Sequence, residues 1–140
     1  MRFMVLVKAS PESESGVMPT TEQLNEMGKF NAELVKAGVM LAGEGIARSA
    51  EGARIRFGGK KPVVTDGPFA ETKELVAGFW IIQVRSREEA IEWMKRAPFQ
   101  DGEIEIRRVH EAADFGAEFT PEMQAAEDRL RDKAAANQTK

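Results

Sequence analysis

The chain has 140 residues, of which 42% are hydrophobic and 31% charged, and its formal net charge is −3. These values predict one folded domain rather than a disordered chain, and no apolar run approaches the ~18 residues of a membrane span. The chain has no cysteine and a single histidine, His110, which excludes disulfides, thiol catalysis and cysteine-rich or multi-histidine metal sites. We therefore expect a cytoplasmic protein without metal or cofactor. Because its net charge is negative, we expect it to bind no nucleic acid.

The first half of the chain predicts a strand, a helix and three short strands. Arg2–Ala9 alternates so that both faces of a strand would be apolar, and the polar stretch Ser10–Gly16 predicts a loop. Thr20 and Gln23 have the spacing of a capping box, which predicts a helix from Thr20 to Ala37. Short strands are expected over Val39–Ile46, Ala53–Phe57 and Lys60–Thr65.

The second half begins with Asp66-Gly67-Pro68, whose turn-forming residues predict a loop of definite shape over 66–74. Val76–Val84 predicts a second strand that is apolar on both faces. Ser86 and Glu89 predict another capping box, at the start of a helix that ends near Pro98. A strand over Glu103–Val109, a third helix from Thr120 and a frayed end over Ala134–Lys140 complete the expected elements.

This order of elements predicts a ferredoxin-like βαββαβ fold of the α+β class with an inserted hairpin. The domain would span residues 1–112, and residues 113–140 would form a tail with a short helix. In this topology Arg2–Ala9 and Val76–Val84 are the central strands, which agrees with their two apolar faces. Because both helices would cover one sheet face, we expect a homodimer through the other face. In the alternative, the segment around Phe115 and Phe119 folds back over that face.

Several charged residues are candidates for chemistry. Asp66 could act as a general base at the mouth of a pocket, or it could accept hydrogen bonds from the amides of its own turn. Glu44 stands between two glycines, which would admit a ligand or permit a β-bulge. Lys73 and Glu74 form either an anion-binding pair or a surface ion pair.

Other residues have a structural interpretation as well as a functional one. Arg54 and Arg56 share a strand face, where they would hold an anion or simply face solvent. Arg107 and Glu105 would line a polar pocket or pair across a dimer seam. Trp80 would belong to the core or, together with Phe30 and Met27, to a ligand wall, and His110 would lie at a surface or interface.

The string at residues 66–74, DGPFAETKE, resembles the DGPF branch of the YCII-related family. Further matching strings lie at residues 37–45, 77–80 and 105–109, so the resemblance covers about residues 1–112. It implies a dimeric α+β barrel with a pocket in the sheet-facing interior. Some family members are thought to be enzymes, and some are encoded beside alternative sigma factors.

The proposed family mechanism uses a histidine in the first helix and an aspartate just after the second. Here Met27 lies near the first position and Ala97 precedes Pro98 at the second, so both groups are missing. We expect a small polar or amphipathic ligand in an interior pocket, with cofactor-free acid–base chemistry by Asp66 and by Glu44 or Lys73. An equally weighted alternative is a non-catalytic binding or regulatory module linked to a sigma factor. The candidate ligand-binding residues are Gly67, Pro68, Phe69, Lys73, Trp80 and Arg107.

Overall fold

The structure is a computed structural model that describes residues 1–138, and the chain divides into two compact units, Met1–Arg108 and Val109–Lys140. The helices of the first unit are α1 (Pro11–Glu14), α2 (Thr21–Lys36) and α3 (Arg87–Met94). Its strands are β1 (Arg2–Lys8), β2 (Met40–Gly45), β3 (Ala53–Arg56), β4 (Val63–Asp66), β5 (Val76–Gln83) and β6 (Ile104–Arg108). The second unit contains two short 3₁₀ turns within Ala112–Glu118, separated by a kink at Gly116, and the helix α4 (Pro121–Asn137).

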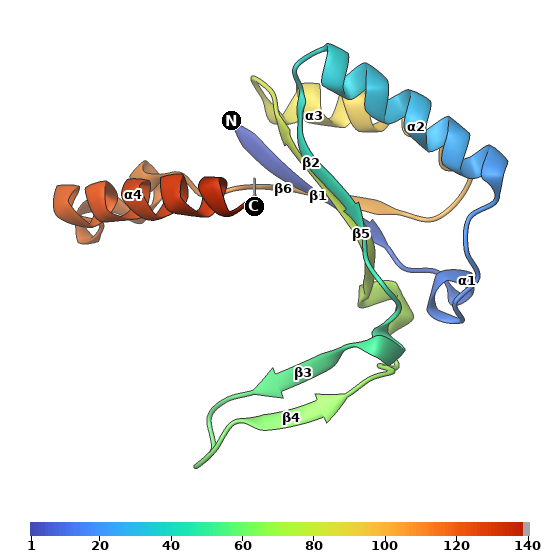
Figure 1. Cartoon of the computed structure of the whole chain (residues 1–140), viewed down its shortest axis with the longest axis horizontal. Coiled ribbons are helices and arrows are strands. Elements are labelled where there is room, and N and C mark those ends of the chain that lie inside the picture. The colour runs from blue at the N-terminus through green and yellow to red at the C-terminus, as the bar shows by residue number, and fades with distance from the viewer. Residues whose placement is uncertain (139–140) are drawn as a thin grey trace. The chain divides into compact units, whose positions relative to one another are not determined.

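Four strands form an antiparallel sheet in the order β2–β5–β1–β6. This order, with the long helix α2 between β1 and β2 and α3 between β5 and β6, is the ferredoxin-like topology. The predicted α+β fold class is therefore confirmed, and β1 and β5 are the two central strands. Strands β3 and β4 pair only with each other and form the inserted hairpin between β2 and β5 (Figure 1).

The hydrophobic core lies between the sheet and the helices α2 and α3, which cover the same sheet face (Figure 1). Phe3 and Val5 of β1 point into it because alternate residues of a strand point to the same face. Leu34 of α2 and Ile82 of β5 are completely buried there. The other core side chains are Phe30, Val39, Trp80, Val84, Ala90 and Met94.

The second sheet face, opposite α2 and α3, has apolar residues in its centre and charges at its edges. Leu6 of β1 lies opposite Phe79 of β5, and the row continues to Glu105 on one side and Glu44 on the other. The adjacent row pairs Met4 with Ile81 and Arg107. Met4, Leu6, Phe79 and Ile81 are each only partly buried.

Capping explains where the helices begin. The Thr20 hydroxyl accepts from the Gln23 N–H at 3.1 Å, and Gln23 Oε1 accepts from the Thr20 N–H at 2.9 Å, which confirms the first capping box. At α3 only half of the predicted box forms. Ser86 Oγ accepts from the Glu89 N–H at 3.1 Å, but Glu89 accepts from the N–H of Arg85 instead of Ser86.

Three local predictions were wrong. Ser10–Gly16 is not all loop, because Ser10 and Ser13 cap each other's backbone and support the short helix α1. Asp66 is not a loop residue but the last residue of β4. The expected fraying over Ala134–Lys140 and a short last helix are contradicted by α4, which has 17 residues and runs to Asn137; residues 139 and 140 lie outside the described range.

No helix among residues 1–138 is long and apolar enough to cross a membrane.

Candidate functional site

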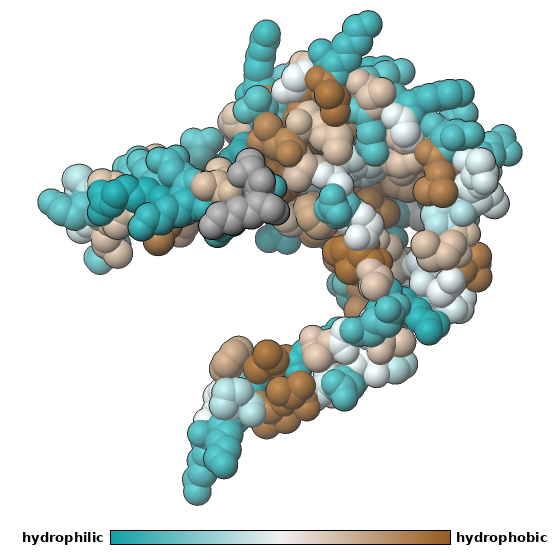
Figure 2. Space-filling view, viewed as in Figure 1, coloured by the Kyte–Doolittle hydropathy of each residue, from teal (hydrophilic) through white to brown (hydrophobic). Residues whose placement is uncertain are grey.

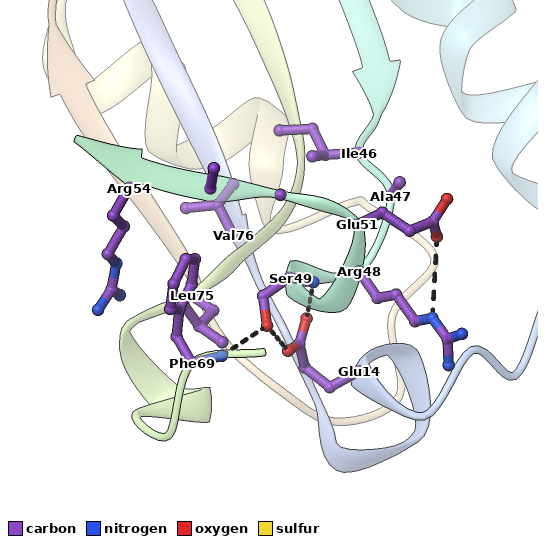
Figure 3. Close-up of a pocket in the computed structure, with 12 residues that line it drawn as sticks. Glu14, Ile46, Ala47, Arg48, Ser49, Glu51, Arg54, Phe69, Leu75 and Val76 are labelled. Carbon is purple, nitrogen blue, oxygen red and sulfur yellow. Dashed lines mark hydrogen bonds and ion pairs between the residues drawn. The ribbon is translucent and has the colours of Figure 1, made fainter. Parts of the chain in front are cut away.

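A cavity of about 320 Å³ lies where the end of β2, the turn Ser49–Glu51 and the start of β5 come together (Figure 3). Its apolar wall is formed by Ile46, Phe69, Leu75 and Val76. Its polar wall includes Glu14, Ser49, Arg48 and Arg54. Small-molecule sites usually combine a mainly apolar lining with a few polar groups, and this recess has a larger polar share than most.

Ser49 ties three separate segments together beside this cavity. Its backbone N–H donates to Glu14 Oε2 at 2.9 Å, and its hydroxyl donates to Glu14 Oε1. The same hydroxyl oxygen accepts from the Phe69 N–H at 3.1 Å (Figure 3). The short helix α1, the turn at Ser49 and the loop after β4 are therefore held in one arrangement.

Gly67 brings its loop directly against the turn at Ser49. A Cβ atom at this position would lie 1.8 Å from the Ser49 carbonyl oxygen, so only glycine fits. The Gly67 N–H donates to the Gly52 carbonyl at 3.0 Å, and the peptide bond between Gly67 and Pro68 is cis. The turn-forming string thus docks the loop and presents Phe69 to the cavity.

The two arginines of the cavity wall hold their carboxylate partners loosely. The Arg54 guanidinium lies 3.9 Å from the centre of the Phe69 ring, and its Nη1 is 3.7 Å from Glu71. Arg48 Nε is 3.8 Å from Glu51, and its Nη1 donates to the Ser15 carbonyl at 3.2 Å. These pairs are half exposed, and such pairs contribute little to stability. Either ion pair can therefore be broken at small cost in stability.

The acid–base properties of the Glu14–Ser49 pair favour a structural role over proton transfer. The two hydrogen bonds from Ser49 lower the pKa of the Glu14 carboxyl below its usual value, because they stabilise the charged form. A carboxylate with a lowered pKa is a weaker base, and the Ser49 proton already points to it. The chain's single histidine, His110, belongs to the second unit and is absent from the cavity lining.

The lowered pKa of Glu14 gives a pH-dependent contribution to stability. Because the folded-state pKa lies below the unfolded-state one, this contribution is present above the ordinary glutamate pKa and is lost as the pH falls through the folded-state pKa. In urea unfolding from about pH 7 to about pH 3, we expect wild type to be more stable than Glu14→Gln at neutral pH. The difference should shrink at acidic pH, and a difference that stays constant would contradict this origin.

Comparison with known proteins places the chain in a family. A family model described as the YCII-related domain matches residues 1–113. The chain belongs to the YCII-related family.

An uncharacterised protein of Rhizobium meliloti is 29% identical to this YCII-related protein over 87 residues, which cover 60% of the chain and 70% of the relative. Among solved structures, 5-chloro-2-hydroxyhydroquinone dehydrochlorinase from Burkholderia phenoliruptrix, in complex with 2,5-dihydroxybenzoquinone, is similar at 17% identity. That match covers 79% of the chain and 96% of the other protein, with a TM-score of 0.36.

The residues predicted from sequence lie in three different parts of the YCII-related unit. Phe69 lines the cavity, and Gly67 and Pro68 form the loop that holds it there. Asp66 is exposed, pairs in register with Ala53, and is not in the cavity lining. Its carboxylate accepts no hydrogen bond from its own turn among residues 1–138, so the interpretation as a self-capped turn residue is not supported.

The remaining candidates do not line the cavity. Lys73 is exposed in the short 3₁₀ turn before β5. Glu44 and Arg107 lie on the second sheet face, where Arg107 donates to Glu105 at 3.1 Å. Hydrogen bonds from Arg107 and from Lys8, 3.3 Å away, lower the pKa of Glu105. This face therefore contains an ion-paired cluster at the β6 edge.

Trp80 is part of the core and not of the cavity wall. Its side chain is buried, its ring meets Phe30 edge-on, and its indole N–H donates to Asn31 Oδ1 at 2.9 Å. Met27 also packs against the core, as does Ala97. The two positions at which the family resemblance implies catalytic groups are thus occupied by packing residues.

Sequence reasoning missed Glu14, Arg48 and Ser49 as cavity residues. Glu14 and Ser49 are 35 positions apart, and the polar segments that contain them look like ordinary loops. Their link depends on the tertiary contact between α1 and the turn after β2. The only local signal was the turn-forming string around Gly67. It predicted a loop of definite shape but not the contact of that loop with Ser49.

Proposed function

We propose that this protein binds a small amphipathic molecule with an anionic group in the cavity beside Phe69. The observation that carries this proposal is a lining that combines an apolar wall with two arginines, Arg48 and Arg54, whose ion pairs are long and exposed. The cavity volume, about 320 Å³, is at the small end of the range for ligand sites, which runs from about 300 to 1,000 Å³. Guanidinium groups favour planar anions such as carboxylates because they donate two parallel hydrogen bonds.

The chemistry of the lining supports a binding module more than an enzyme. Glu14 has a lowered pKa and is engaged by Ser49, which makes it a poor general base. The carboxylates proposed for acid–base work, Asp66 and Glu44, are not in the lining. A regulatory role, such as sensing a metabolite for a sigma factor, is consistent with binding without turnover.

Arg54 and Arg56 provide a matched pair of variants for testing the ligand site. Both belong to β3, but only Arg54 lines the cavity. In a thermal-shift screen of small carboxylic acids and phosphate esters, we expect compounds that stabilise wild type to bind Arg54→Ala about 10- to 150-fold more weakly, because a guanidinium–anion contact contributes about 1.5–3 kcal/mol.

The same compounds should bind Arg56→Ala and Asp66→Ala as they bind wild type. Equal binding to wild type and Arg54→Ala would contradict the proposed site. Loss of binding in Asp66→Ala alone would move the ligand to the hairpin end and favour the acid–base alternative.

We also propose that the protein is a homodimer through the second sheet face. Met4, Leu6, Phe79 and Ile81 form a continuous apolar area across the central strands and are only partly buried. Monomeric proteins rarely expose a continuous apolar patch of more than a few hundred Å². Packing this face on its twofold copy would bury the patch and enclose the charged edge residues Glu44 and Arg107.

A further inference from the structure

The β3–β4 hairpin is more exposed to solvent than is usual for a structured segment. Every residue from 53 to 66 is exposed, and the two strands pair with each other but with none of the four strands of the main sheet. An isolated two-stranded hairpin is at best marginally stable in water. The two strands therefore do not provide, by pairing with each other alone, the packing against further elements that stabilises a hairpin.

One face of this hairpin is apolar. Ile55 lies directly opposite Val64, and the strand alternation, continued one residue past the end of β3, places Phe57 on the same side as Ile55. The exposed fractions are 57% for Ile55, 63% for Val64 and 74% for Phe57. Figure 2 shows hydrophobic residues gathered on the hairpin, with hydrophilic atoms at its tip.

The charge of the hairpin is opposite to that of the rest of the chain. Residues 53–66 contain four cationic side chains, two of them the adjacent lysines Lys60 and Lys61, and one carboxylate, Asp66. Since the whole chain has a net charge of −3, the remainder has a net charge of −6. The rest of a second copy is therefore opposite in net charge to the hairpin, which favours their association.

The base of the hairpin is fixed, so the segment is presented in a defined direction. The Gly67 N–H bonds to the Gly52 carbonyl just outside the ladder, and Arg54 stacks on Phe69. The hairpin leaves the sheet after β2 and returns at β5, and these two strands contain Glu44 and Phe79 of the second sheet face. It is thus continuous with the border of the proposed dimer interface.

We infer that the hairpin is a dimerisation arm, whose apolar face of Ile55, Phe57 and Val64 packs on a second copy of this chain. The inference rests on the proposed homodimer and extends it beyond the sheet. In a twofold dimer each arm contacts the opposite copy, so every hairpin substitution acts twice. The fixed base lowers the entropy that the arm loses on docking.

Sedimentation equilibrium over a dilution series tests the arm. The variant is the double substitution Phe57→Ser/Val64→Ser, and the matched control is Leu24→Ser/Val35→Ser, which removes two similarly exposed apolar side chains from α2. We expect the hairpin variant to raise the dimer dissociation constant at least about 30-fold and the control to leave it near the wild-type value, with unchanged circular dichroism for both. Lys60→Glu/Lys61→Glu should also weaken the dimer, more strongly at low salt.

A wild-type dissociation constant in the hairpin variant would overturn the arm and leave the sheet-face dimer standing. A wild-type monomer at micromolar concentration would overturn both, whereas ligand binding in the thermal-shift screen reports separately on the proposed function.

Cross-linking gives the position of the arm. Because the chain has no cysteine, Lys60→Cys can be labelled at one site with a benzophenone maleimide. In a mixture of isotopically light and heavy protein, we expect light–heavy cross-links. Cross-links within one chain only, including any to α4, would overturn the inference.

Discussion

Replacing Gly67 with alanine should release the loop at Gly67–Phe69 from the turn at Ser49. The added Cβ would lie 1.8 Å from the Ser49 carbonyl oxygen and 2.6 Å from its carbon, and both belong to backbone that cannot rotate away. The loop must shift, which breaks the bonds from the Gly67 N–H to Gly52 and from the Phe69 N–H to Ser49. We expect the free energy of unfolding to fall by about 2–3 kcal/mol, the range for strain together with lost buried hydrogen bonds.

Two measurements check this expectation. Urea unfolding gives the stability change, and hydrogen exchange should show the amides of Gly67 and Phe69 exchanging at least about tenfold faster. Gly45→Ala is the matched control because a Cβ at Gly45 meets nothing within 4 Å. If Gly67→Ala kept wild-type stability and amide protection, the close approach of loop and turn would be refuted.

Truncation of Trp80 to alanine should have the largest effect on stability. The side chain is 4% exposed and contacts the rings of Phe30 and Phe99 at centroid distances of 5.8 and 6.2 Å. Removal of a buried tryptophan costs about 3–5 kcal/mol and also leaves the Asn31 amide oxygen without its donor. Because domains are usually stable by about 5–15 kcal/mol, the variant should be close to unfolding at room temperature.

Trp80→Phe separates packing from hydrogen bonding, since it retains an aromatic ring but loses the indole N–H. We expect it to cost about 1–2 kcal/mol in urea unfolding followed by circular dichroism. Both variants should keep the ligand affinity of wild type under conditions in which they are folded. A folded Trp80 variant that lost the ligand would restore Trp80 to a ligand wall and contradict its place in the core.

The fold was predictable because several independent local patterns agree with one topology. Phe3 and Val5 alternate with Met4 and Leu6, which predicted a strand with two apolar faces, and β1 lies in the centre of the sheet between β5 and β6. The capping pair Thr20 and Gln23 marked the start of α2. Such signals are local or periodic, and they survive in the folded state because packing reinforces them.

The cavity was only partly predictable for a physical reason. Gly67 and Phe69 lie in a string whose turn chemistry is visible in the sequence, but Glu14 and Ser49 acquire their role from a contact between distant loops. The short helix α1 was not predicted because it has no apolar stripe. Its main sequence signal is the pair of serine residues that cap it. Asp66 looked catalytic because the sequence could not show that it ends a strand of an exposed hairpin.

The sheet order has a consequence for synthesis of the chain on the ribosome. The central strand β1 is made first, yet both of its partners come late, since Phe3 pairs with Ile82 and with Arg108. At ~5–20 residues per second, roughly 100 residues of further synthesis keep one edge of β1 unpaired for ~5–20 seconds. During that interval a strand with two apolar faces is open to wrong partners. The emerging chain should therefore depend on a holding chaperone until β6 is complete.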